Sequence, residues 1–110
     1  MTAPASASAP ARVRVIRLLR VRDGMEAEFV RSYQDVRAGA ERFPGHLGEQ
    51  LCRSLDDPAQ WLLTSEWADL DAIGRWRTAD AHRNLVEPMN ACLHDDRWTG
   101  VFQVKEMAAQ

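Results

Sequence analysis

The chain has 110 residues, of which 14 are Lys or Arg, 16 are Asp or Glu, and 45% are hydrophobic. This length fits one domain with a single core, and the formal charge of −2 gives no electrostatic reason to expect a nucleic-acid partner. No apolar run approaches the roughly 18 residues that a membrane span requires, so we expect a soluble protein without membrane partners.

Residues 1–11 (MTAPASASAPA) consist almost entirely of small residues and prolines. Such a segment has too little apolar surface to pack, and we predict a disordered N-terminal arm. A secretory signal would need an apolar core after a basic start, and the sequence has none there, so a cytoplasmic location is expected. Residues 12–110 are predicted to form a single domain.

The first part of this domain has the pattern of a strand followed by a long helix. Arg12–Arg22 is rich in β-branched residues and leucine, with polar residues between them, which predicts a strand. Asp23-Gly24 ends it, and Asp23 is a candidate N-cap of the following helix. Apolar residues recur at helical spacing from Met25 to Phe43, and Pro44-Gly45 is expected to end the helix.

Two further strands are expected to form a hairpin. His46–Leu55 is the second strand, and an Asp-Asp-Pro turn at residues 56–58 follows it. Trp61–Trp67 is strongly apolar, which predicts a central third strand.

The rest of the chain carries two helical stretches and a last strand. Asp69 or Asp71 can cap a short helix that presents Ile73 and Trp76. The next helical stretch contains a proline, Pro88, at which we expect a kink or a break. This proline-containing helical stretch covers Ala79–Leu93, and the fourth strand covers Trp98–Glu106.

The resulting order is β-α-β-β-α-β, the split β-α-β pattern of a ferredoxin-like α+β fold with a four-stranded antiparallel sheet. Helices cover one face of such a sheet. The strands here are apolar on both faces, since Leu62 and Leu63 point in opposite directions, as do Val101 and Phe102. A bare apolar sheet face is unfavourable in water, so we predict a homodimer that buries it.

The segment FPGHLGEQLCRSLDDPAQWLLTSEWADLDAIGRWRTADAHRNLV resembles the antibiotic biosynthesis monooxygenase (ABM) family. The matching features are Pro44-Gly45 before the second strand, a short hairpin turn, Glu66-Trp67 at a strand end, and His82 at the start of an apolar helix. With its flanking elements, the similarity extends over residues 12–106. It implies a dimeric α+β barrel.

Members of this family include cofactor-independent oxygenases that convert anthrone-type aromatic polyketides into quinones. The resemblance therefore implies a pocket between sheet and helices, where a deprotonated aromatic substrate itself reduces dioxygen without flavin or metal. Some oxygenases of the family carry an asparagine four residues before the strand-end tryptophan, and Leu63 stands at that position. Heme-degrading relatives are disfavoured because the first strand has no asparagine and their histidine position falls near Val86, although Trp76 matches their tryptophan.

The resemblance points to Trp67 and His82 as catalytic candidates. Trp67 could donate its indole N–H to a substrate oxygen or stack on an aromatic ring, and it could equally be a core residue. An unperturbed imidazole titrates near neutral pH, so His82 is a candidate general acid or base, or else a capping or exposed histidine.

Four further residues are candidates for substrate binding. Trp76 would line the roof of the pocket, and Tyr33 shares an apolar helical stripe with Phe29. Arg17 interrupts an apolar strand and could pair with an enolate, or lie at the surface. Each of these residues also has an ordinary structural interpretation, as core or surface.

No metal-ligand spacing, glycine-rich phosphate loop or nucleophile elbow is present, and we predict neither a metal nor a cofactor. The leading hypothesis is a cofactor-independent monooxygenase of an aromatic polyketide, using dioxygen. A non-oxidative cyclase or binding protein is the alternative, and the leucine at position 63 favours it somewhat. Removal of quinones and isomerase-like chemistry remain open by fold alone.

Overall fold

The computed structural model describes residues 12–106. The predicted N-terminal arm lies outside the described residues. Within them the predicted order of elements is confirmed. The third strand begins one residue before its predicted start, and the other long elements end up to a few residues inside their predicted limits. The elements are β1 (Val13–Arg20), α2 (Glu26–Ala40), β2 (His46–Arg53), β3 (Gln60–Trp67), α3 (Leu70–Thr78), α4 (Asp80–Asn90) and β4 (Trp98–Gln103).

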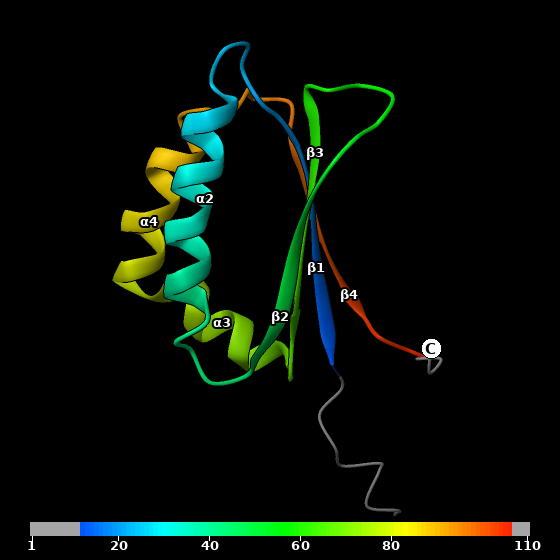
Figure 1. The fold of residues 1–110 in the computed structure, drawn as a ribbon. Helices are drawn as coiled ribbons and strands as arrows, with labels where there is room; N and C mark the ends of the chain where they lie inside the picture. The colour runs from blue at the N-terminus through cyan, green and yellow to red at the C-terminus, as the bar shows by residue number, and fades with distance from the viewer. Residues whose placement is uncertain (1–11, 107–110) are drawn as a thin grey trace, which may run out of the picture.

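The strands form one antiparallel sheet in the order β2-β3-β1-β4. Strand β3 is central, as predicted, and forms a hairpin with β2. All three helices lie against the same face of the sheet, so the molecule has two layers (Figure 1). This is the ferredoxin-like α+β architecture predicted from the order of elements.

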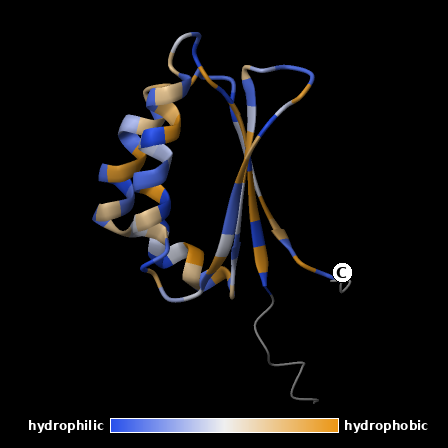
Figure 2. Ribbon diagram, viewed as in Figure 1, coloured by the Kyte–Doolittle hydropathy of each residue, from blue (hydrophilic) through white to orange (hydrophobic). Residues whose placement is uncertain are grey.

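The alternation of side chains along the central strands places the core between the layers. On β1, Val13, Val15 and Leu19 are buried beneath the helices, while Leu18 is 37% exposed on the other face. Strand β1 alternates visibly between apolar and polar residues in Figure 2. On β3, Trp61, Leu63 and Trp67 are buried in the same layer.

Helices α2 and α4 pack closely because of a glycine. A Cβ atom at Gly39 would lie 2.4 Å from a methyl carbon of Leu85 and 3.4 Å from the Trp76 ring. The absent side chain therefore lets the two helices approach each other above the sheet.

Two expectations about helix ends are corrected. Asp23 does not cap α2, because the N-cap is Met25 and makes no side-chain cap bond. Asp23 lies two residues earlier, in the turn, while the Gly24 N–H donates to Glu26 Oε2 at 3.3 Å. Of the kink or break expected at Pro88, the break does not occur: helix α4 continues to Asn90, and Pro88 lacks the N–H that would bond to the Asn84 carbonyl. Asp69 does cap α3, accepting a bond from the Ala72 N–H at 2.8 Å.

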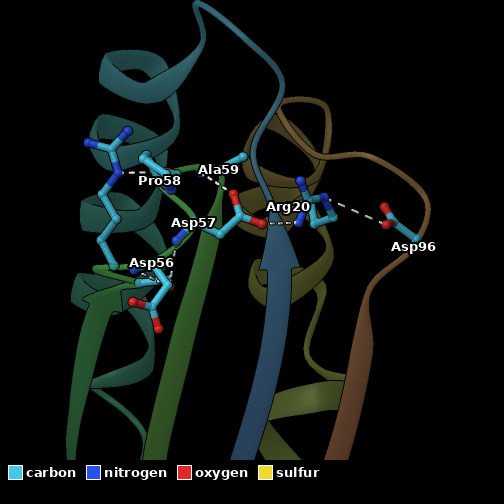
Figure 3. A network of polar contacts seen from close by, with 8 residues as sticks. Arg20, Asp56, Asp57, Pro58, Ala59 and Asp96 are labelled. Carbon is cyan, nitrogen blue, oxygen red and sulfur yellow. Dashed lines mark hydrogen bonds and ion pairs between the residues drawn. The ribbon is translucent and has the colours of Figure 1, made fainter.

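A polar network joins the loops at one end of the sheet (Figure 3). Arg20 Nη1 donates to Asp57 Oδ2 at 2.8 Å, and Arg20 Nε lies 3.8 Å from Asp96 Oδ2. Asp57 Oδ1 also accepts from the Ala59 N–H at 3.1 Å. The hydrogen bond from Arg20 lowers the pKa of Asp57. This network fastens β1 to the β2–β3 turn and to the segment before β4.

The face of the sheet away from the helices carries an apolar patch, which we call the open face: Leu18, Leu62, Trp98 and Phe102. Trp98 is 49% exposed and Phe102 is 46% exposed. Their ring centroids are 6.1 Å apart, and both rings approach the position that a Cβ of Gly100 would occupy. Register places Leu18 between Leu62 and Trp98 on adjacent strands, so the patch is continuous. Among residues 12–106, no helix is long and apolar enough to cross a membrane.

Gly45 and Gly24 give a matched test of this packing. Both have positive φ, of 95° and 80°, but a Cβ at Gly45 would lie 2.5 Å from the Ala72 Cβ, whereas Gly24 has open space around it. We expect Gly24→Ala to lower the free energy of unfolding by roughly 1–2 kcal/mol, the cost of the backbone conformation. Gly45→Ala should lower the free energy of unfolding by about 1–3 kcal/mol more, because the added methyl group overpacks the contact with Ala72. Urea denaturation measures both, and equal losses would contradict the predicted clash.

Candidate functional site

A small cavity lies between the inner face of the sheet and the helices, with a volume of about 70 Å³. Its apolar wall comes from both layers, with Val15 and Leu63 from the sheet and Ile73 and Trp76 from α3. Its polar lining consists of Arg17, Glu49, Ser65, Arg77 and His82. Residues far apart in the sequence therefore meet around one partly open cavity.

Four of the six candidate residues predicted from the sequence line this cavity: Trp67, His82, Trp76 and Arg17. Tyr33 and Phe29 are buried but do not line it. Phe29 packs edge-on against Trp61, with ring centroids 5.3 Å apart, which places it toward the other end of the core.

Trp67, at the end of β3, is held on two sides. Its indole N–H donates to the Ser65 hydroxyl oxygen at 3.0 Å, and its ring meets the His46 ring at 5.0 Å and 89°. The indole is 2% exposed, so it is a core residue as well as part of the cavity wall. Ser65 accepts the indole bond and keeps its own hydroxyl hydrogen for donation toward the cavity.

His82, in the first turn of α4, packs edge-on against Trp76, with ring centroids 4.9 Å apart. Burial lowers the pKa of His82, and the positive charges of Arg17 and Arg77 lower it further. The imidazole is therefore neutral at pH 7 and has a nitrogen that can accept a proton.

Arg17, on the inner face of β1, is half-buried in the cavity floor. It donates a long hydrogen bond, 3.5 Å from Nη2 to Asn90 Oδ1. Burial lowers the pKa of Arg17, and Arg97 and Arg77 lower it further. Leu63 lies opposite Arg17 in the β1–β3 register and is 8% exposed, so it contributes an apolar side chain to the cavity wall.

The sequence analysis missed a buried group of polar residues beside Trp67. Glu49 lines the cavity, and its Oε1 lies 2.9 Å from His46 Nε2, with both side chains at most 6% exposed. Tyr33 joins them, because burial and a hydrogen bond to Glu49 raise the pKa of its phenol. Regular strand alternation puts residues three apart on opposite faces, so the sequence gave no reason to pair His46 with Glu49. A register shift between His46 and Gly48 turns both inward.

Among residues 12–106, no group of three or more His, Cys, Asp or Glu side chains is placed to hold a metal ion. The site thus consists of aromatic and aliphatic walls, one neutral imidazole, a hydroxyl, a carboxylate paired with histidine, and two guanidinium groups. Such a set can bind a flat apolar molecule, transfer a proton and stabilise negative charge.

The two-layer fold and this cavity define a ferredoxin-like α+β protein with a site between sheet and helices. The model of the antibiotic biosynthesis monooxygenase family matches residues 12–88, and the chain belongs to this family. The resemblance inferred from the Pro44-Gly45, Glu66-Trp67 and His82 segment is confirmed.

Relatives in actinomycetes are similar over most of the chain. A 42.8 kDa protein in the whiE locus of Streptomyces coelicolor is 45% identical over 84 residues, which cover 76% of this chain and 21% of that protein. Polyketide synthase CurD of Streptomyces cyaneus is 37% identical over 86 residues, covering 78% of this chain and 23% of that protein. The chain thus spans about a fifth to a quarter of the length of these relatives.

The fold is also that of solved structures. SnoaB, a cofactor-independent oxygenase from Streptomyces nogalater, superposes with a TM-score of 0.81 at 21% identity, covering 91% of this chain and 99% of that one. At this identity the likeness establishes the fold, which agrees with the architecture described above.

The electrostatics of His82 can be tested by NMR. Its pKa is expected to lie below the ordinary value of 6.5. Arg17→Gln should raise the pKa by removing one of the two cations that oppose protonation, while burial keeps it below 6.5. Replacement of exposed Arg83, the next residue on α4, by glutamine is the control and should leave the titration unchanged. A His82 pKa at or above 6.5 in the unmodified protein would refute this account.

Proposed function

We propose that the protein is a cofactor-independent monooxygenase that oxidises an anthrone-type aromatic polyketide intermediate to a quinone. The observation that carries the proposal is the meeting of Trp67, Trp76, Arg17 and His82 around one cavity. Family membership and the similarity to polyketide synthase CurD support a place in polyketide biosynthesis. The cytoplasmic location expected from the sequence stays a prediction.

In the proposed reaction the neutral imidazole of His82 removes a proton from the activated carbon of the bound substrate. The negative charge spreads onto a substrate oxygen, where the Ser65 hydroxyl can donate a hydrogen bond and the nearby guanidinium groups stabilise the anion. The carbanion transfers an electron to dioxygen, and the two radicals combine to a peroxide anion. This anion takes the proton from His82, and loss of water leaves the carbonyl. Overall, a CH₂ group and O₂ yield C=O and H₂O.

The cavity must enlarge to admit such a substrate. Its volume of about 70 Å³ is well below the roughly 300 Å³ at which small-molecule sites begin. Ala79, between α3 and α4, has an extended backbone, with φ −72° and ψ 142°. Arg77 and His82 lie on either side of this joint, so a change there would move part of the cavity wall.

Oxygen uptake with an anthrone and no added cofactor tests the function. We expect uptake above the spontaneous rate and an oxygen-18-labelled quinone from labelled dioxygen. His82→Ala should lower kcat about 10²- to 10⁴-fold by removing the base. Trp67→Phe should lower it too, because the bond that orients Ser65 is lost. Exposed His94, outside the cavity lining, provides the matched control His94→Ala, with unchanged turnover. Unchanged rates in both site variants would overturn the assignment.

A non-oxidative cyclase or binding role is the second candidate. Leu63 favours it, since an apolar side chain replaces a possible amide donor in the cavity wall. Mass spectrometry separates the two, because oxygenation changes the oxygen content of the product and cyclisation adds none. Binding of the anthrone without uptake would support this second candidate.

The open face supports a homodimer with one cavity in each subunit. Its aromatic rings are about half exposed, and burial against a second copy removes them from water. Phe102→Glu should dissociate the dimer, as measured by size-exclusion chromatography with light scattering at micromolar concentration. Leu55→Glu is the control, because Leu55 is fully exposed (100%) in the β2–β3 turn, outside the open face. A monomeric unmodified protein would refute the dimer.

A further inference from the structure

Two arginines, Arg17 and Arg77, line the cavity, and Arg17 can be compared with two arginines of the same strand. On β1, Arg14 lies 2.7 Å from Glu66 and Arg20 lies 2.8 Å from Asp57, so each has a carboxylate. Within residues 12–106, no ion pair is formed by Arg17 or Arg77, although both line the cavity. Arg17 has only the long contact of 3.5 Å with Asn90.

The one carboxylate in the described lining of the cavity does not balance these charges. Glu49 is engaged by His46 at 2.9 Å and by the phenol of Tyr33. The charges that act on Arg17 come from other arginines, Arg97 and Arg77, and both oppose its own charge. The cavity therefore has an excess of positive charge beside His82.

A half-buried guanidinium group without an anion, as at Arg17, is costly, because lost hydration is not replaced by paired charge. A carboxylate would supply both opposite charge and two acceptor oxygens that match the fork of a guanidinium. Arg17 lies in the cavity floor on β1, whereas Arg77 is exposed in the last turn of α3 and marks the mouth. The apolar wall formed by Val15, Leu63 and Trp76 can contact an aromatic ring system.

We propose that Arg17 and Arg77 form an anion subsite that binds a carboxylate of the substrate, so that the substrate is an aromatic carboxylic acid. This inference rests on the proposed function for the aromatic part of the ligand, but it concerns binding and does not require oxidation. The carboxylate lies between the two guanidinium groups, and the rings lie against the apolar wall.

Equilibrium binding of two matched ligands tests the subsite. Anthraquinone-2-carboxylate and anthraquinone-2-carboxamide share size and shape and differ in charge, and quenching of tryptophan fluorescence reports their binding. We expect the carboxylate to bind the unmodified protein at least tenfold more tightly, the size of effect that a charge-assisted hydrogen bond supplies. Equal affinities, or binding of neither ligand, would overturn the proposal.

Variants then assign the preference to these residues. Arg17→Gln should abolish the tenfold preference while leaving carboxamide affinity within about twofold, and Arg77→Gln should reduce the preference. Arg83→Gln removes the same charge from an exposed site on α4 and should leave the preference intact. Because Arg77 is exposed, its variant remains informative if Arg17→Gln fails to fold. A preference that survives both cavity variants would refute the subsite.

Oxygen uptake separates this inference from the proposed function. A carboxylate preference that depends on Arg17, without any uptake, would support the subsite and refute the oxygenase. Uptake with a neutral anthrone and no preference between the two ligands would support the oxygenase and refute the subsite.

Discussion

The pairing of β1 with β3 in the middle of the sheet is the constraint on which the rest of the structure depends. It sets Val13 opposite Trp67 and Arg17 opposite Leu63. Because side chains alternate along a strand, this one register decides which of them lie beneath the helices. A shift of one residue would turn the side chains of one of the two strands to the other face and so separate Arg17 from Trp67.

The polar groups of the cavity divide into two sets of different character. Glu49 is within hydrogen-bond distance of His46 and is hydrogen-bonded to the Tyr33 phenol, and this set is almost fully buried beside Trp67. The other set combines the neutral imidazole of His82 with the guanidinium groups of Arg17 and Arg77, which form no ion pair among residues 12–106. An imidazole whose pKa is lowered by burial, next to guanidinium groups, suits a site in which negative charge arrives with the substrate or forms during the reaction.

The two faces of the sheet have separate roles. The inner face combines the core with the cavity, and Gly39 and Gly45 allow the helices to approach closely enough to close it. The open face is continuous and apolar around Leu18 and the pair Trp98 and Phe102. The proposed chemistry and the proposed dimer contact thus lie on opposite sides of one sheet.

The sequence by itself determined the order of elements, the hairpin, the cap at Asp69 and the apolar character of both sheet faces, because these follow from local spacing and turn chemistry. Similarity to a family also singled out Trp67 and His82. Only the tertiary structure decided which polar residues share the cavity, because that depends on register and on helix packing. The irregularity near Gly48 brings His46 and Glu49 to one face of the sheet. Arg17 and Arg77, which are 60 residues apart in the chain, line the same cavity. Neither arrangement follows from local periodicity.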